Sequence, residues 1–480
     1  MKKKAFKTLL VIYVGYCLTA AIRVNAQQYF TADQIRTDFG LFRQALQEAH
    51  PGLYRYNTRE SMDSLFLKTE SQLNKEMTQQ EFYQLLLPVV AQIRCGHTKL
   101  HPDNNWTDNY FFSQEKLFPY KLFFQEDRAW IMDSYDSSGV VKKGLEVISV
   151  NGDPLPGIIG KLLSGFLSDG NNKTFKYLEM SKFFSAYYAN LIGVPDTFII
   201  GCRDGDRFLE LKAAGIDKSQ IERYERLSGS NQPYALSFPA ESAALLTITS
   251  FWMEDDRVGF RQFLKQSFAE INARGIEHLV IDVRNNEGGI DKRGSMLLSY
   301  LVDQKFRYYD RLETTTNKKY SFAAHARLPR FYGIIRLLVS KADSGRYVWK
   351  HNRNLKTRKP QKQPFKGKVY VLTNGASFSV TAEFAAVTHF LKRATFIGEE
   401  TGGGYYGNNS GTFVIVTLPN SRLNVGIPML AYYTAVSGYP YRDRGVVPDH
   451  EVKPTVNDML SARDVVLEYT LRMIHQKNGE

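Results

Sequence analysis

Cysteine is scarce in this chain of 480 residues, which has only three, and Cys17 lies in an apolar N-terminal segment. The other two, Cys95 and Cys202, are too few for a disulfide framework, although an oxidising compartment would allow them to pair. Long apolar runs are also absent after the N-terminal segment, since no stretch reaches the roughly 18 residues of a membrane-spanning helix. We therefore expect no stable membrane insertion of the mature chain.

Sequence signatures of several functional classes are missing as well. The glycine-rich segment Gly398–Gly404 lacks the Gly-Lys-Ser/Thr ending of a phosphate-binding loop, which argues against a nucleotide site. No group of potential ligands has the spacing of a metal site, so no metal and no cofactor is expected. No compact basic and aromatic motif is present, so no nucleic acid partner is expected either.

The N-terminus has the composition of a secretory signal. Four lysines lie within Met1–Lys7, an apolar run covers Thr8–Ile22, and Val24-Asn25-Ala26 offers a cleavage site with small residues. Residues 1–26 are therefore interpreted as a signal peptide of an exported protein, periplasmic or secreted; an uncleaved anchor is the alternative. They hold five of the 62 Lys and Arg and none of the 49 acids, so the mature chain keeps a net charge of about +8.

The remaining chain is long enough for two or three domains. Residues 27–115 show helical periodicity, and Thr78 with Glu81 three residues later is typical of a capping box. Residues 116–213 are rich in strand patterns, including one that closes on an Asn-Gly turn at Asn151. Residues 214–235 are polar and are interpreted as a linker.

Residues 236–480 alternate short apolar strands with helices, which indicates an α/β layer. Leu279–Val283 is a nearly continuous apolar strand, as buried parallel strands are. It runs into Gly288 and Gly289, where a backbone N–H without a neighbouring Cβ is able to hold an oxyanion. Residues 311–367 are basic with weak patterns and are interpreted as an insertion over the surface.

A second strand, Val369–Leu372, leads into a sharp turn and a helix that begins near Val380. A serine in such a turn gains the positive end of the helix dipole, and the next N–H is able to stabilise a developing oxyanion. Ser377 and Ser379 both lie in this turn. An isolated serine at a helix start is usually a cap, so the turn alone does not establish a nucleophile.

Six segments in this order resemble the serine peptidase family of tail-specific (C-terminal processing) proteases and the tricorn protease core. They are Cys95–Thr98, Gly144–Asp153, Asp282–Gly289, Phe378–Ala385, Gly398–Gly403 and Gly445–Asp449. The resemblance covers nearly the whole mature chain. It implies an α/β catalytic domain with ClpP/crotonase-like βαβ layers, an N-terminal helical region and a PDZ-like β-rich domain at residues 116–213.

The resemblance selects Ser379 as the nucleophile, because the family's Phe-Ala pair lies five and six residues further on, at Phe384 and Ala385. Ser377 lacks this spacing. The family's glutamate follows the serine by three residues, whereas here Glu383 follows by four.

The base distinguishes two branches of the family. The tail-specific branch uses a lysine at the position of Gly404, and residues 393–452 contain no lysine. The tricorn-like branch uses the histidine of its Gly-His-Thr element, which here is His97. A neutral imidazole is able to accept the serine proton near neutral pH. The acid nearest to the branch's third group is Asp443, whereas Asp449 is expected to fix a turn.

The resemblance implies a serine-type endopeptidase, in which Ser379 attacks a peptide carbonyl while His97 takes its proton. The N–H groups of Gly288 or Gly289 and of Val380 are expected to hold the oxyanion.

Gly402 and Gly403 are expected to lie beside an extended polypeptide substrate, an unfolded or C-terminal segment. Two alternatives remain open. The same fold occurs in modules that resemble interphotoreceptor retinoid-binding protein and bind apolar ligands, and the same machinery would serve an esterase of small acyl substrates. The oligomeric state is not determined by the sequence.

Overall fold

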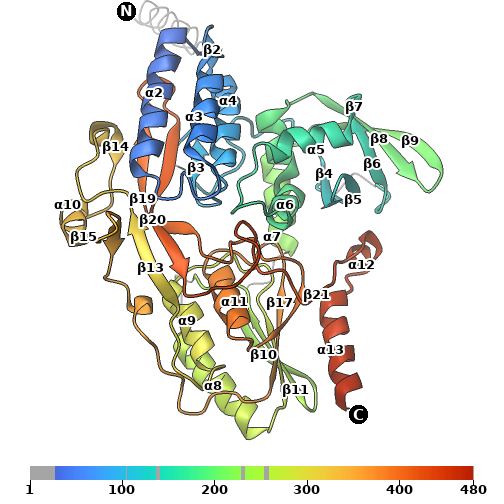
Figure 1. The fold of residues 1–480 in the computed structure, drawn as a ribbon. Helices are drawn as coiled ribbons and strands as arrows, with labels where there is room; N and C mark the ends of the chain where they lie inside the picture. Colours follow the sequence, from blue (N-terminus) through green and yellow to red (C-terminus); the bar gives the residue numbers. More distant parts are fainter. Residues whose placement is uncertain (1–27, 104, 137–140, 229–232, 253–258, 479–480) are drawn as a thin grey trace, which may run out of the picture.

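The structure, a computed structural model, describes residues 28–103, 105–136, 141–228, 233–252 and 259–478 (Figure 1). It shows a mixed α/β fold with several sheets, as predicted. The predicted signal peptide, residues 1–26, lies outside the described residues. None of the helices in the described ranges is both long and apolar enough to cross a bilayer.

The N-terminal region is helical, as its periodicity predicted. Its helices are α2 (Ala32–Ala49), α3 (Arg59–Glu70) and α4 (Gln79–Gln92). The predicted capping box begins α4: the N–H of Thr78 donates to the Glu81 carboxylate at 2.8 Å, and the N–H of Glu81 donates to the Thr78 hydroxyl at 3.2 Å. Two short strands, β1 (Tyr29–Phe30) and β2 (Met77–Thr78), pair in antiparallel fashion beside these helices.

The middle region is an antiparallel sheet with two covering helices, and Figure 1 shows it to one side of the molecule. Its strands are, in spatial order, β4 (Tyr120–Gln125), β5 (Arg128–Ser134), β6 (Glu146–Val150), β8 (Thr197–Asp204) and β9 (Arg207–Ala214), and β7 (Asp153–Pro154) pairs with β6. The covering helices are α5 (Leu155–Leu163) and α6 (Thr174–Leu191). Asn151 and Gly152 both have positive φ, as the predicted Asn-Gly turn requires. The predicted linker 214–235 contains a helix, α7 (Lys218–Ser228).

A largely parallel sheet forms the base of the C-terminal region, residues 236–480. Its spatial order is β10 (Tyr234–Ala240), β11 (Ala243–Ile248), β12 (His278–Asp282), β17 (Lys368–Thr373), β18 (Thr395–Gly398) and β21 (His450–Glu451). From β11 to β21 every neighbouring pair is parallel, whereas β10 and β11 form an antiparallel pair.

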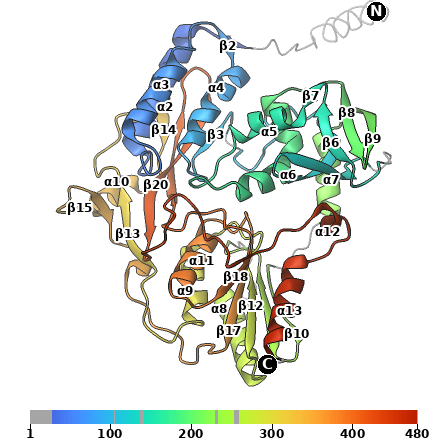
Figure 2. The same ribbon diagram turned by 45° about the vertical axis from the view of Figure 1, so that its right-hand side comes forward.

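Helices cover both faces of this sheet (Figure 2). They are α8 (Phe260–Ala273), α9 (Asp291–Ser299) and α11 (Val380–Phe390) on one face and α13 (Val465–Asn478) on the other, with α12 (Val456–Leu460) preceding α13. Leu279 and Ile281 of β12 pack with the first group, and Val280 packs with α13. Burial on both faces explains why the strand is apolar throughout.

A second sheet joins the helical region to the C-terminal region. Its spatial order is β14 (Ala326–Arg327), β19 (Asn409–Thr417), β20 (Asn424–Thr434), β13 (Tyr309–Thr314), β16 (Tyr347–Trp349) and β15 (Val339–Lys341), and β3 (Lys99–His101) also pairs with β20. The apolar faces of α2 and α4 share a core with β19 and β20. Residues 311–367, predicted as a surface insertion, contribute β14, β15 and β16 and most of β13 to this sheet.

Candidate active site

The turn between β17 and α11 presents Ser379. Its backbone has φ 54° and ψ −123°, a conformation that residues other than glycine rarely adopt, and α11 begins at the next residue. Ser377, the competing serine, is fully buried, and its hydroxyl donates to the carbonyl of Val283 at 2.9 Å. Ser377 therefore fixes the turn to the end of β12, while the half-buried Ser379 is the accessible hydroxyl.

His97 reaches this serine from the loop between α4 and β3. Its Nε2 lies 3.1 Å from the Ser379 hydroxyl, although the two residues are 282 positions apart in the chain. The imidazole stacks on Phe378, with ring centroids 4.7 Å apart. A Cβ on Gly96 would lie 2.6 Å from the Phe378 ring, so glycine is needed for this close approach. The structure thus brings together the two predicted residues.

The environment of His97 keeps its imidazole neutral. Burial, with a smaller contribution from the charge of Lys99, lowers the pKa of His97 from 6.5 to about 3. At neutral pH the ring is therefore unprotonated, and Nε2 is able to accept a proton from the serine.

A carboxylate that the sequence analysis did not select, Asp169, lies behind His97. It is buried, and its two oxygens accept the N–H groups of Gly96 at 2.9 Å and Gly404 at 3.4 Å. One nitrogen of His97, the Cys95 sulfur and a carboxylate oxygen of Asp169 all lie within 4.8 Å of one another. Burial raises the pKa of Asp169 to about 6.

Nε2 of His97 faces Ser379, whereas Nδ1 is buried and has no hydrogen-bond partner among the described residues. Asp169 belongs to residues 168–175, which cover the end of the α5–α6 connection and the first residues of α6. This segment contacts both the histidine loop and the nucleophile turn: the N–H of Gly170 donates to the carbonyl of Arg94 at 3.0 Å, and Phe175 stacks on Phe378. The only sequence signal was the polar run Ser168–Asn172, which has the composition of an ordinary turn.

Cys95, His97 and Asp169 are also the one group of metal-ligand side chains found within the described residues. Each already has another role in this structure. The Cys95 thiol, which is not in a disulfide, donates to the carbonyl of Asn409 at 3.7 Å, Asp169 accepts two N–H groups, and His97 faces Ser379. Cys202, the second candidate for a disulfide, is buried and unpaired too.

Asp443, predicted as the third group, lies nearby but is directed elsewhere. Its carboxylate accepts the side-chain amide of Asn171, and its carbonyl accepts the N–H of the same residue at 2.7 Å. These bonds attach Asp443 to residues 168–175 instead of to His97. Asp449 accepts the N–H of Phe396 at 2.7 Å and so fixes a turn, as expected.

The predicted oxyanion donors differ in availability. The N–H of Gly288 donates to the Asn286 side chain at 3.0 Å, so this donor is already engaged. For Gly289 and Val380, no hydrogen bond from the N–H is found within the described part of the chain. A Cβ on Gly288 would lie 2.7 Å from the Ser379 Cβ and 3.0 Å from the Val380 nitrogen, so this glycine allows the two turns to meet.

Gly402 and Gly403, which the sequence analysis expects beside the substrate, pack in this structure against the nucleophile turn. Both are buried. A Cβ on Gly402 would lie 2.0 Å from the carbonyl oxygen of Gly375, and one on Gly403 would lie 2.5 Å from the Cβ of Ala382. These glycines therefore allow the chain to pack closely against the nucleophile turn and the start of α11. A hollow of about 390 Å³ lies instead beside Gly288 and Gly289, and its other lining residues are Thr249, Ser250, Trp252, Asn285 and Glu287.

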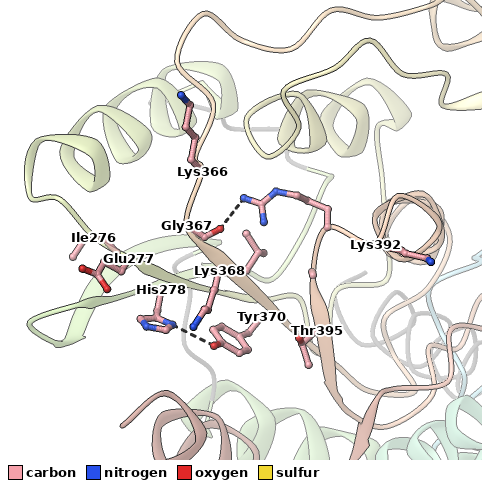
Figure 3. Close-up of a pocket in the computed structure, with 12 residues that line it drawn as sticks. Ile276, Glu277, His278, Lys366, Gly367, Lys368, Tyr370, Lys392 and Thr395 are labelled. Carbon is pink, nitrogen blue, oxygen red and sulfur yellow. Dashed lines mark hydrogen bonds between the residues drawn. The ribbon is translucent and has the colours of Figure 1, made fainter. Parts of the chain in front are cut away.

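A larger cavity, of about 850 Å³, lies at the opposite end of the parallel sheet (Figure 3). Its residues come from the amino ends of β12, β17 and β18, including His278 and Lys368, whereas the active-site turns follow the carboxyl ends of β12 and β17. Arg393 beside it donates to the carbonyl of Gly367 at 2.9 Å. This cavity is therefore separate from Ser379.

Glu383, the glutamate that follows the serine by four residues, is buried in α11. It accepts the hydroxyl of Tyr309 at 2.5 Å and the side-chain amide of Asn408 at 2.9 Å, and burial raises its pKa to about 7. These bonds tie α11 to the second sheet.

A second buried histidine, His50, contacts the loop that carries His97, and its burial should make the stability of the fold depend on pH. His50 contacts the hydroxyl of Thr98 at 2.8 Å, and burial lowers its pKa from 6.5 to about 3. As the pH falls below 6.5 the unfolded chain binds a proton at His50 and the folded chain does not, so stability is lost toward pH 3. The loss is about 1.4 kcal/mol per pH unit for such a group.

Glutamine at position 50 keeps hydrogen-bonding capacity and does not titrate. We therefore expect His50→Gln to be less stable than wild type at pH 7, and this difference in free energy of unfolding to shrink as the pH falls to about 4. Denaturant titrations at both pH values measure it. A difference that stays constant would show that His50 does not bind the proton on unfolding.

Comparison with known proteins agrees with this geometry. Residues 242–452 match the model of peptidase family S41. The structure of mature CPAF complexed with lactacystin is similar to this one, with a TM-score of 0.65 and 15% sequence identity over 92% of this chain and 97% of that chain. The crystal structure of mature CPAF has a TM-score of 0.62 and 14% identity, over 89% of this chain and 94% of that chain. At these identities the two structures show the fold alone.

The matched residues include the turn that follows β12, Ser379 and Asp443. His97 and Asp169 lie before the matched range. The solved structures show the fold, and the family match indicates the class of reaction. Residues 242–452 therefore form a domain that matches peptidase family S41, and this match supports a serine-type hydrolase.

Proposed function

We propose that this protein is an exported serine endopeptidase that hydrolyses unfolded or C-terminal polypeptide segments through an acyl-enzyme. The observation that carries the proposal is the 3.1 Å contact between His97 Nε2 and the hydroxyl of Ser379, formed at a strained turn by residues from different regions of the chain. A hydroxyl beside a neutral imidazole is the arrangement of an activated nucleophile.

In the first step the Ser379 oxygen attacks the peptide carbonyl carbon while Nε2 of His97 takes the hydroxyl proton. The resulting imidazolium then gives this proton to the leaving amine, which breaks the peptide bond and leaves an ester on Ser379. A water molecule, deprotonated by the same nitrogen, hydrolyses the ester and regenerates the serine.

Asp169 is proposed as the residue that positions His97. When Nε2 accepts a proton, the imidazole becomes positive inside a buried site, and a nearby negative carboxylate stabilises that charge. A carboxylate oxygen of Asp169 lies within 4.8 Å of a ring nitrogen of His97. Nδ1 of this ring has no hydrogen-bond partner within the described residues. Asp443 is bonded to Asn171, which makes it the weaker candidate for this role.

Val380 and Gly289 are proposed as the oxyanion donors. Val380 is the first residue of α11, so its N–H adds the field of the helix N-terminus at the position where negative charge develops. The neighbouring hollow of about 390 Å³ lies beside Gly289 and contains the exposed Trp252, so a substrate side chain would fit there. An extended substrate would run along this edge.

The finer domain assignments are proposals of the same kind. The antiparallel middle sheet with its Asn-Gly turn is compatible with a PDZ-like domain that captures peptide ends, and the helix-covered parallel sheet is compatible with ClpP/crotonase-like layers. Export to the periplasm or beyond is supported by the composition of residues 1–26.

Hydrolysis of an unfolded protein tests the reaction class. We expect the chain without residues 1–26 to cleave reduced, unfolded casein, and to cleave a folded, compact domain far more slowly, because only an extended chain reaches Ser379. Separation of the fragments by mass measures both rates. Failure to cleave any polypeptide, together with saturable binding of an apolar fluorophore, would instead favour a ligand-binding module.

A further inference from the structure

The charge of this protein is concentrated in one segment. Residues 311–367 contain 15 of the 62 Lys and Arg but only two of the 49 acids, Glu313 and Asp343. The rest of the chain therefore has 47 basic and 47 acidic residues, and the whole formal charge of +13 corresponds to this segment. Five of those 47 basic residues lie in residues 1–26, so without them the chain is slightly acidic outside residues 311–367. The segment therefore produces a local positive field.

The same segment exposes a group of large apolar side chains. Phe331 is 62% exposed, Ile334 60%, Leu337 71% and Leu338 42%, all within eight residues. Phe331 immediately precedes α10 (Tyr332–Ile335), Ile334 lies in it, and Leu337 and Leu338 lie in the 3-10 turn Arg336–Leu338 that follows. We call these four residues the apolar tip. A single exposed leucine needs no explanation, but a contiguous group of this kind marks an interaction site.

The apolar tip is held in place by ordered structure. Tyr332 is buried beneath it and stacks on Tyr320, which stacks in turn on Phe322. Strand β14 pairs with β19 on one side of the tip, and β15 pairs with β16 on the other. The exposure of the tip therefore results from the fold.

Cations surround the apolar tip. Arg330 lies over the ring of Phe331 at 4.9 Å, Arg336 lies within the tip, and Arg327 and Lys341 are exposed on the adjoining strands. Among the described residues, none of these four cations forms an ion pair with a carboxylate. Their charge is thus available to a partner.

We propose that the apolar tip and its cations dock the enzyme on an anionic phospholipid surface. Exposed aliphatic and aromatic side chains enter the boundary between headgroups and acyl chains, while flanking Arg and Lys contact the negative headgroups. A nucleic acid would use the cations but leave Ile334, Leu337 and Leu338 in water. A protein partner would have to be both apolar and strongly acidic, whereas an anionic bilayer has both properties.

Docking in this way leaves the other side of the enzyme accessible. In both views α10 and β15 lie at one lateral edge of the molecule, and β8 and β9 lie at the opposite edge (Figures 1 and 2). The middle region would therefore face the aqueous phase, where polypeptide substrates arrive.

Sedimentation with vesicles tests the proposal. We expect the protein without residues 1–26 to sediment with vesicles of phosphatidylcholine and phosphatidylglycerol in equal parts, and not with pure phosphatidylcholine. Raising the salt from about 0.1 M to 0.5 M should weaken binding, because it screens the cations. The double variant Ile334→Ser/Leu337→Ser should bind the mixed vesicles about tenfold more weakly or worse, since less apolar area enters the bilayer.

The matched control is Phe208→Ser, which removes an equally exposed apolar residue from β9 at the opposite edge and should bind as wild type does. Thermal unfolding of both variants confirms that each is folded. Wild type that stays in the supernatant, equal binding to pure phosphatidylcholine, or undiminished binding by the double variant would each overturn the proposal. If wild type and Phe208→Ser form dimers, the double variant does not, and none of them binds vesicles, the tip would instead be a contact with a second copy of this chain.

Discussion

Replacement of Ser379 by alanine should reduce polypeptide hydrolysis by roughly 10⁵-fold or more, because it removes the atom that forms the acyl-enzyme. His97→Ala should cause a loss of similar size, since no other described side chain forms a hydrogen bond with the Ser379 hydroxyl. The double variant should be no worse than either single one, because the two residues act as a unit. Fragment formation from unfolded casein measures all three rates.

Ser377→Ala is the matched control for this experiment, since it removes the neighbouring hydroxyl of the same turn. Loss of its hydrogen bond to the carbonyl of Val283 should lower stability by about 1 kcal/mol and leave the hydrolytic reaction measurable. The assignment would be reversed if Ser377→Ala were inactive and Ser379→Ala cleaved casein at the wild-type rate.

Asp169→Asn should lower kcat by roughly 10²- to 10⁴-fold with little change in KM, because an amide does not stabilise the imidazolium that forms in the transition state. The pH profile separates this role from a structural one. Above its pKa of about 6 Asp169 is charged and supports the reaction, so kcat/KM of the wild type should fall as the pH drops below 6. His97 itself stays neutral there, because its pKa is about 3.

In Asp169→Asn the decline near pH 6 should be absent from the remaining activity. Asp443→Asn is the matched control, since this carboxylate bonds Asn171, and its variant should keep the wild-type pH profile. If Asp443→Asn removed the decline and Asp169→Asn did not, Asp443 would be the group that acts on His97, as the sequence predicted, and Asp169 would be a structural residue.

Local patterns predicted much of the fold because local physics determines those features. The capping box at Thr78, the turn at Asn151 and the apolar strand from Leu279 depend on residues close together in sequence. The strands of residues 311–367 were not predicted, since β14, β15 and β16 have only two or three residues each. Such short strands are defined by their partners in the sheet, and their own sequence carries little signal.

The candidate site could be predicted where a motif and its chemistry coincide. Ser379 and His97 were selected from the sequence, and the structure places them in contact. Asp169 was missed because it belongs to a turn without a motif and approaches His97 only through the packing of residues 168–175. The role of Gly402 and Gly403 stays a prediction, because a glycine pattern does not distinguish contact with a substrate from contact with a neighbouring turn. In this structure both glycines pack against neighbouring backbone or side chains that leave no room for a Cβ.

Covalent labelling of the active serine tests the central claim most directly. A fluorophosphonate probe forms a stable bond only with a serine that an adjacent base activates, and mass spectrometry of the digested protein locates the adduct. The account predicts one adduct, on Ser379, that is absent in Ser379→Ala and much slower to form in His97→Ala. An unlabelled wild-type protein, or an adduct on Ser377 instead, would contradict it.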